Sequence, residues 1–325
     1  MYTAAFRVLE ILSSSKEPVT GDDISLKLSI SRSAVWKHIQ KLTEIGYEIS
    51  TSHEGYLLKQ RTDIHLPYEV HKKLRTGFIG RQMRYFEKTP STISTAKEIL
   101  QNENVERIHG MVVIAEEQTG GMGRLGRSWL SPSGGIWVTI VLNPAIPVER
   151  LFMVTMAGAI AVARSIRREY DLGALIKWPN DIFIGDKKVA GLLLEIGADE
   201  GVVNYCLLGI GIDVNIPVNK LEEVLIDGVT SISSELEHDV DRAALLARVL
   251  KEFESRYLLL EEEEYDAIIR EWKSLSCTLD HRVKILTLKN TFEGDAFDID
   301  ESGALMIRKD NGRVEHVISG DCLNT

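Results

Sequence analysis

The segment from Gln118 to Trp129 holds the residue types in this chain that are best suited to ligand chemistry. It combines four glycines with Arg124, Arg127 and Trp129, and it follows the strand-like apolar run 111–115. Glycines let backbone N–H groups approach a ligand, arginine offers a planar charged fork for phosphate, and tryptophan offers a flat face for a base. The segment therefore predicts a loop that closes over a phosphorylated, base-bearing ligand. The alternative is a flexible surface loop whose arginines are only solvated.

The same segment matches neither of the two common phosphate-binding motifs. A P-loop places lysine and then serine or threonine after its final glycine, whereas Arg127 and Ser128 follow Gly126 here. Residues 121–126 have the spacing of a dinucleotide-binding Rossmann loop, but that loop must open a helix. Pro132 and the glycines after it would break such a helix, which disfavours the Rossmann interpretation.

The elements that would position functional groups begin with three short helices near the N-terminus. The pattern predicts helices over 4–12, from Thr20 onward, and over 32–45. Ser31 is a good N-cap for the third helix, and Gly46 follows it as a C-terminal stop.

Two short strands, 47–50 and 55–58, then flank a turn and give a β-wing. This order predicts a winged helix-turn-helix whose third helix enters a DNA major groove, and the alternative is a small helical protein-interaction domain. Residues 1–61 carry eight basic against seven acidic side chains, whereas the whole chain has a net charge of −10, so this segment is the one most open to DNA. The candidate DNA-binding residues are Arg32, Ser33, Trp36, Lys37, Gln40 and Lys41.

Strands and helices mix after a polar linker at 59–63. Pro67 stands in the first turn of a helix, and Thr95 with Glu98 predicts a capping box for another. A long amphipathic helix is expected over 149–170.

A hairpin around residues 185–186 places Lys188 at the start of a strand, and helices are predicted over 242–262 and 265–275. Beyond these helices short strands alternate with turns, which predicts a small SH3-like β-barrel. We therefore expect an α+β protein with three domains: the winged helix-turn-helix at 1–62, a mixed α/β domain at 66–276 and the C-terminal barrel at 277–325.

The glycine-rich segment resembles the adenylate-binding loop of biotin–protein ligases, whose pattern is G-R-G-R-x-G-R-x-W. It departs from that pattern at Met122, where the family usually has arginine. Residues 177–181 equal the family's K-W-P-N-D motif, and residues 188–191 resemble its K-[LV]-[AS]-G motif.

Two further motifs resemble the family with one substitution each. Ser94 and Thr95 are similar to its S-T-N motif, with Ala96 in place of asparagine. Residues 209–215 are similar to G-I-G-I-N-V-N, with Asp213 in place of asparagine, and an ionised carboxylate cannot donate the hydrogen bond that asparagine offers to a base. The N-terminal and C-terminal extensions resemble the bifunctional ligase–repressor subtype.

The resemblance implies a catalytic domain like that of class II aminoacyl-tRNA synthetases and a reaction in two steps. Biotin and ATP would form biotinyl-AMP with Mg²⁺ present, and the biotinyl group would then pass to a lysine of a biotin carboxyl carrier protein of acetyl-CoA carboxylase. The resemblance also implies binding to operator DNA as a homodimer that biotinyl-AMP promotes. Fixed cations would stabilise the charge that builds on phosphate oxygens in both steps.

The resemblance also assigns roles to single residues. Lys188 would bridge the carboxylate of biotin and the α-phosphate, Trp129 would pack on adenine, and Gly191 and Gly211 would leave room for biotin. The implied catalytic residues are Lys188, Arg124, Arg127 and Asp181. The implied biotin-binding residues are Ser94, Thr95, Gln118, Gly121, Met122, Gly123, Arg124, Lys188, Gly191 and Gly211. The implied ATP- or adenylate-binding residues are Arg124, Arg127, Trp129, Lys177, Asn180 and Asp213.

Composition sets the remaining expectations. Cys206, Cys277 and Cys322 are scattered without zinc spacing or a disulfide framework, which fits a reducing compartment and no bound metal ion. No signal peptide opens the chain, and the apolar run 151–163 is shorter than the ~20 residues of a membrane span, so we expect a cytoplasmic protein that does not contact a membrane. The alternatives are a lipoate–protein ligase, whose R-R-x-S-G-G-G signature is missing, a transcription factor that only senses biotin, and a ligase without a DNA role.

Overall fold

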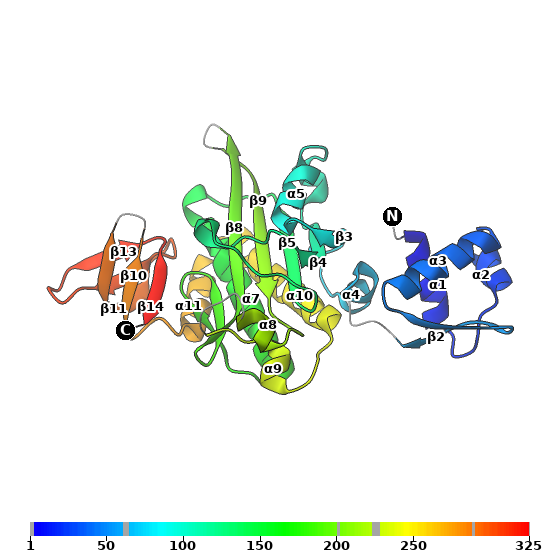
Figure 1. Cartoon of the computed structure of the whole chain (residues 1–325). Helices are drawn as coiled ribbons and strands as arrows, with labels where there is room; N and C mark the ends of the chain where they lie inside the picture. Colours follow the sequence, from blue (N-terminus) through cyan, green and yellow to red (C-terminus); the bar gives the residue numbers. More distant parts are fainter. Residues whose placement is uncertain (1–2, 61–64, 200–201, 223–227, 288–289, 325) are drawn as a thin grey trace. The chain divides into compact units, whose positions relative to one another are not determined.

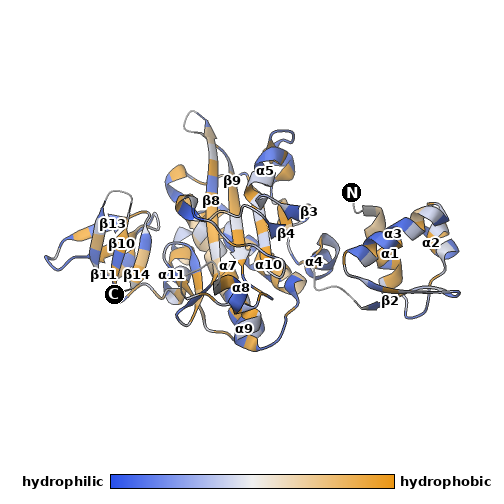
Figure 2. Cartoon of the chain, viewed as in Figure 1, coloured by the Kyte–Doolittle hydropathy of each residue, from blue (hydrophilic) through white to orange (hydrophobic). Residues whose placement is uncertain are grey.

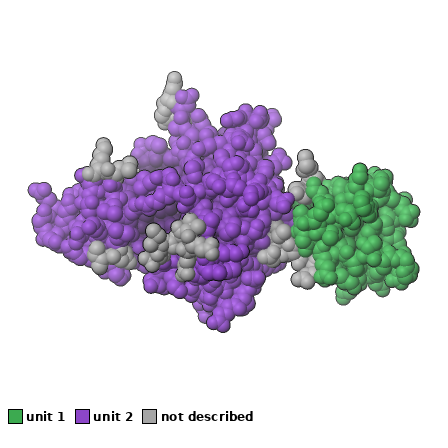
Figure 3. Space-filling view, viewed as in Figure 1, with its two compact units in different colours: residues 1–64 green, residues 65–325 purple. Residues whose placement is uncertain are grey.

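The computed structural model describes residues 3–60, 65–199, 202–222, 228–287 and 290–324. The chain divides into two compact units, residues 1–64 and residues 65–325 (Figure 3).

The first unit is a three-helix fold with a two-stranded wing, as the sequence predicts (Figure 1). The side chain of Thr20 accepts a hydrogen bond from the backbone N–H of Asp23 and so starts the second helix. Ser31 caps the third helix in the same way, by accepting from the backbone N–H of Ala34. The elements are α1 Thr3–Ser13, α2 Gly21–Leu28, α3 Arg32–Glu44, β1 Glu48–Ser52 and β2 Gly55–Gln60.

The wing is hydrogen-bonded to the residues that precede α2. Val19 and Tyr56 exchange two backbone hydrogen bonds of 2.9 Å each. Gly55 has a φ of +130°, and a Cβ added there would lie 2.4 Å from the carbonyl oxygen of Val19. This turn therefore requires glycine.

The second unit is built on a seven-stranded sheet with the order β3-β4-β5-β9-β8-β7-β6. The β3–β4 pair is parallel, and the other neighbours pair in the antiparallel sense. The strands are β3 Met83–Thr89, β4 Val112–Gln118, β5 Ile136–Leu142, β6 Ala174–Lys177, β7 Asp181–Ile184, β8 Lys187–Asp199 and β9 Val202–Ile212.

Helices cover both faces of this sheet because successive side chains of its strands point to opposite faces. Val112 and Ile114 of β4 belong to the large core beneath α7, α10 and α11, whereas Val113 packs with Ile93 of α5. Hydrophobic residues are accordingly concentrated on α7 and along the central strands (Figure 2). The helices of the unit are α4 Pro67–Lys73, α5 Thr92–Leu100, α6 Val105–Ile108, α7 Phe152–Tyr170, α8 Val218–Glu222, α9 Ile232–Leu236, α10 Arg242–Glu261 and α11 Tyr265–Leu275.

Two predicted helix starts are wrong. Helix α5 begins at Thr92, and its N-cap is Ser91 instead of Thr95, because Ser91 already accepts a hydrogen bond from the N–H of Ile93. The long helix α7 begins at Phe152, and Glu149 lies in a separate 3₁₀ turn.

A five-stranded antiparallel sheet with the order β13-β12-β11-β10-β14 follows α11. The sequence predicts four of its strands and misses β14. Gly320 precedes β14, and a Cβ added there would lie 2.5 Å from Cγ2 of Ile285, so glycine lets this strand pack closely on β10. The strands are β10 His281–Leu286, β11 Thr291–Ile299, β12 Leu305–Arg308, β13 Val314–Val317 and β14 Asp321–Asn324.

Candidate active site

The second unit contains a cavity of about 620 Å³, a size typical of small-molecule sites. Its walls come from the start of α5, the glycine-rich segment, the β6–β7 turn, strands β8 and β9, and the segment 320–323. The predicted site residues that line it are Gln118, Met122, Gly123, Arg124, Arg127, Trp129, Lys177, Asn180, Asp181, Lys188, Gly191 and Gly211.

The glycine-rich segment folds back on itself as a compact hairpin. Trp129 donates a backbone hydrogen bond of 2.8 Å to Gly121, and Gly123 donates one of 2.7 Å to Arg127. A Cβ added at Gly121 would lie 2.5 Å from the carbonyl oxygen of Trp129, which explains the glycine there although Gly121 does not line the cavity. Leu125, at the tip, has a φ of 56°.

The two arginines of this hairpin have different surroundings. Arg124 donates hydrogen bonds to Oδ1 of Asn180 at 3.1 Å and to the carbonyl oxygen of Gly320 at 3.3 Å. Burial lowers its pKa, while the nearby charges of Asp181 and Asp321 act in the opposite direction. Arg127 pairs in a bidentate manner with Asp321, with a 3.0 Å contact between Nη1 and Oδ1, and these hydrogen bonds raise the arginine's pKa.

Lys188 lies at the start of β8, where the sequence predicts it. Its ammonium group is 2.6 Å from Oδ1 of Asp181 and 4.9 Å from the ring centroid of Trp129. The side chains of Lys188 and Asp181 are only 25% and 24% exposed, so their ion pair is shielded from solvent. The geometry therefore holds one cation at the cavity wall between a carboxylate and an aromatic face.

Gly191 and Gly211 line the cavity, and both make room for the indole of Trp129. A Cβ at Gly191 would lie 3.1 Å from Cζ3 of Trp129, and one at Gly211 would lie 2.8 Å from its Nε1. The space that these two glycines were predicted to leave for biotin stays a prediction, and Trp129 is the neighbour that an added Cβ would meet at each of them. The buried Nε1 of Trp129 has no hydrogen-bond partner among the described residues.

Ser94 and Thr95 do not line the cavity, and their contact with a ligand stays a prediction. Ser94 donates to the backbone oxygen of Ser91, and Thr95 shares a 2.7 Å hydrogen bond with Thr89. Ser91 and Thr92 line the cavity in their place. Two Ser-Thr pairs, at 91–92 and 94–95, lie three residues apart in the sequence. The position at which α5 begins is the signal that distinguishes them.

The side chain of Gln118 joins this end of the cavity to the hairpin. Its Oε1 accepts from the backbone N–H of Thr92 at 2.8 Å and from the hydroxyl of Thr92 at 3.1 Å. Its Nε2 donates to Oγ of Ser131 at 2.8 Å. Ile93, Val138 and Leu193 add apolar surface near these polar groups.

The segments around the β6–β7 and β7–β8 turns contribute further charged residues to the cavity wall. Lys177 lies with its Nζ 4.8 Å from the ring centroid of Phe183, and Asp186 also lines the wall. Sequence reasoning missed Phe183, Asp186 and Asp321, because none belongs to a recognisable motif.

Asp213 is buried and lies outside the cavity lining. Burial raises its pKa well above the usual range, although Lys188 acts in the opposite direction. The neutral acid is therefore favoured, and a protonated carboxyl does have a donor. The lack of a hydrogen-bond donor that the sequence predicts for an ionised Asp213 therefore does not apply to the protonated acid.

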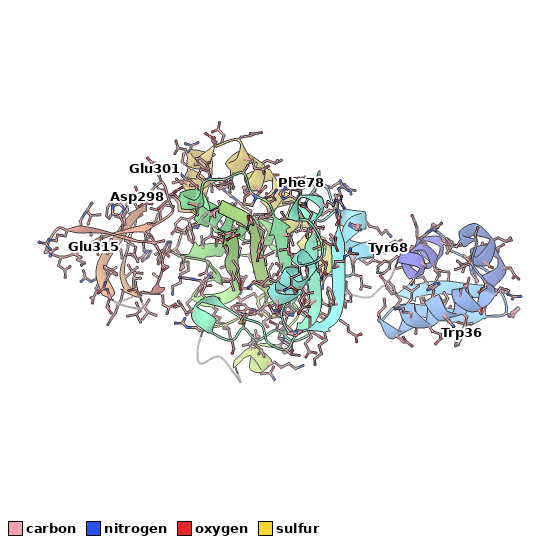
Figure 4. All side chains as sticks on the ribbon, turned by 90° about the horizontal axis from the view of Figure 1, so that it is seen from above. Trp36, Tyr68, Phe78, Asp298, Glu301 and Glu315 are labelled. Atoms are coloured by element: carbon pink, nitrogen blue, oxygen red, sulfur yellow. The ribbon has the colours of Figure 1, made fainter. Side chains whose placement is uncertain are left out.

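Helix α3 presents a largely exposed polar face in the first unit. The exposed residues include Arg32, Ser33, Trp36, Lys37 and Gln40, whereas Lys41 is half-buried. Nε of Arg32 is 3.0 Å from Oδ1 of Asp22, so this arginine already has a counter-ion. Trp36 is 54% exposed and projects from the outer surface of the unit (Figure 4).

The described residues lack two kinds of feature. They contain no group of three or more His, Cys, Asp or Glu side chains arranged to hold a metal ion. None of the described helices is long and apolar enough to cross a membrane.

Three regions of the chain match known families. Residues 85–213 match the biotin/lipoate A/B protein ligase family, residues 5–57 match an HTH domain, and residues 278–323 match the biotin protein ligase C-terminal domain.

Similarity to curated proteins extends over nearly the whole chain. The bifunctional ligase/repressor BirA of Bacillus subtilis is 34% identical over 97% of this chain and 96% of its own length. BirA of Escherichia coli is 27% identical over 90% of this chain and 88% of its own length. Among solved structures, the biotin protein ligase of Aquifex aeolicus in complex with biotin and ATP is 28% identical, with a TM-score of 0.65 over 75% of this chain and 100% of that chain.

Proposed function

Since this chain belongs to the family of bifunctional biotin ligase/repressors, we propose that it joins biotin to a lysine of an acceptor protein with ATP and represses transcription in response to biotin. The observation that carries the ligase half is that one cavity combines three kinds of lining. Its wall contains the cations Arg124, Arg127 and Lys188, the polar side chain of Gln118, and apolar residues. This combination suits a ligand with an apolar acyl part and a phosphate.

In the first step, the carboxylate of biotin attacks the α-phosphate of ATP, and pyrophosphate leaves. Lys188 lies between the two oxyanions, and Asp181 orients it through their 2.6 Å contact. Arg124 and Arg127 stabilise the charge that builds on the phosphate oxygens. Lys177 and Asn180 bind the nucleotide beside them.

In the second step, the amine of the acceptor lysine attacks the acyl carbon, and AMP leaves. The hairpin of residues 121–129 shields the mixed anhydride from water until the acceptor arrives. Trp129 gives the adenylate an aromatic wall above Gly191 and Gly211. Gln118, Ser91 and Thr92 bind the ureido ring of biotin, in place of the predicted Ser94 and Thr95.

Mg²⁺ enters as a complex with the phosphates of ATP. The ion supplies charge neutralisation on the phosphates when it is bound.

The acceptor is a biotin carboxyl carrier protein of acetyl-CoA carboxylase.

The regulatory function uses helix α3 of the first unit. A biotinyl-AMP-promoted homodimer would place two copies of α3 on the half-sites of an operator. Dimer binding is needed because residues 1–61 have nearly balanced charge, so one unit neutralises few phosphates.

The ligase test is incubation with ATP, Mg²⁺, biotin and a biotin carboxyl carrier domain, followed by the mass of the carrier. We expect a mass gain of one biotinyl group that requires both small molecules. Failure of the carrier to gain this mass, with a folded protein, would contradict the ligase assignment.

The regulatory test is operator binding and sedimentation with and without biotin plus ATP. We expect both to tighten with the two ligands, and Lys37→Ala to weaken operator binding while carrier labelling stays unchanged. Lys16→Ala is the comparison variant, because Lys16 is an exposed lysine of the same unit that lies outside α3. Operator binding that ignores biotin and ATP would refute the regulatory half and leave the ligase half standing.

A further inference from the structure

The charged residues that line the cavity differ in whether they pair with an opposite charge. Two of its carboxylates each hold one cation: Asp181 contacts Lys188, and Asp321 contacts Arg127. Arg124 instead bonds neutral oxygens of Asn180 and Gly320. The complete charged set is Arg124, Arg127, Lys177 and Lys188 against Asp181, Asp186 and Asp321, which leaves one net positive charge.

That charge matches one ligand of the proposed reaction better than the other. An acyl-adenylate carries a single phosphate charge, whereas ATP carries the charges of three phosphate groups. The arrangement in which Asp321 holds Arg127 therefore suits the intermediate, and ATP needs Arg127 to be free.

Asp321 reaches the hairpin from a strand almost 200 residues away along the chain, at a separation of 194. The close packing of Gly320 on Ile285 places β14 there and also presents the carbonyl oxygen of Gly320 to Arg124. Both arginines of the hairpin are thus held from the start of β14 and the glycine that precedes it.

The Arg127–Asp321 contact is open enough to exchange. Arg127 is 64% exposed and Asp321 is 24% exposed, so water screens the pair and the ion pair is weak. A polyphosphate, which offers several oxyanions in bidentate geometry, competes well for such an arginine.

We propose that Asp321 is a positioning residue that yields Arg127 to the polyphosphate of ATP and takes it back once pyrophosphate has left, so that β14 fastens the hairpin over the adenylate. This inference rests on the proposed ligase function. Asp321 touches no reacting atom and acts only through Arg127.

The test compares Asp321→Asn with Asp310→Asn. Asp310 also forms a bidentate pair with an arginine of the same sheet, Arg282, with contacts of 2.8 and 3.0 Å, and it does not line the cavity. Pyrophosphate release gives the KM for ATP, and chase of labelled biotin from the preformed complex gives the rate of adenylate release.

For Asp321→Asn we expect release of the adenylate to be about fivefold faster, which is the size that loss of an exposed bidentate ion pair gives. The KM for ATP should be unchanged or lower, because a competing carboxylate is gone. Asp321→Glu should restore slow release, and Asp310→Asn should match wild type in both measurements.

A purely structural role for Asp321 predicts a higher KM for ATP together with faster release, and that result would overturn the inference. Equal release from Asp321→Asn and Asp310→Asn would overturn it as well. In an Arg127→Ala background, Asp321→Asn should have no further effect on release, and an additive effect would count against the inference. If wild type forms no adenylate at all, the proposed function itself has failed.

Discussion

Replacing Gly211 by alanine tests whether Trp129 is seated by the glycines beneath it. The new Cβ would lie 2.8 Å from Nε1 and 3.1 Å from Cε2 of Trp129, and 3.4 Å from Cε3 of Trp137. Trp137 is fully buried in the core and cannot move away, so the indole of Trp129 must rise toward the cavity by several tenths of an ångström.

Overpacking of this kind costs about 2 kcal/mol, within the usual range for one inserted methyl group in a tight site. For a folding unit of this size, that loss lowers Tm by roughly 4–8 °C. The displaced indole should also intrude on the ligand, so we expect KM for ATP or biotin to rise. Thermal unfolding and pyrophosphate release measure the two effects.

Gly173→Ala is the matched control, because a Cβ there would have no neighbouring atom within 4 Å and Gly173 does not line the cavity. In a Trp129→Leu background the clash should be relieved, so Gly211→Ala should then cost much less. An equal cost in both backgrounds would show that Trp129 is not what Gly211 accommodates, and a neutral Gly211→Ala would refute the packing argument altogether.

Three further outcomes are expected. Lys188→Ala should lower the rate of adenylate formation by about 10²-fold or more while circular dichroism shows an intact fold, by analogy with loss of a donor to a developing oxyanion; near-normal pyrophosphate release would remove Lys188 from the mechanism. Arg124→Gly should release adenylate faster and raise biotinylation of bystander lysines, because its hydrogen bonds to Asn180 and Gly320 are lost; a wild-type rate of release would contradict this. Asp213→Asn should be increasingly more stable than wild type as pH rises above about 4, the pKa of an unfolded aspartate, because burial raises the folded pKa of Asp213 and wild type loses stability while the unfolded aspartate ionises and the folded one stays protonated. Thermal melts across a pH series measure that gap, and a gap that narrows with rising pH would show that Asp213 is not held as the neutral acid.

Local signals along the chain were enough to predict much of the fold. Thr20 and Ser31 stand at the starts of the two helices that the sequence predicts there, and Lys188 lies near the start of the strand that its hairpin predicts. Each of these features depends on residues only a few positions apart, where propensity and capping act directly. The central sheet and the small C-terminal sheet also follow the predicted fold class.

The features that sequence reasoning did not foresee depend on contacts between distant segments. Ser91 and Ser94 are each followed by threonine, and only the packing of α5 decides which serine faces the cavity. Gly191 and Gly211 look like space for a ligand until Trp129, from another segment, is seen to lie on them. Asp321 carries no motif, because its role depends on where β14 pairs with β10.

The cavity is assembled from segments that emerge from the ribosome at very different times. Ser91 is made early, whereas residues 320–323 follow only after the rest of the wall has been synthesised. The first unit is compact within residues 1–64, and N-terminal domains generally fold first during synthesis. A nascent chain of this protein should therefore present a folded α3 well before it can retain a nucleotide. Ribosome-bound fragments should show that order by protease resistance.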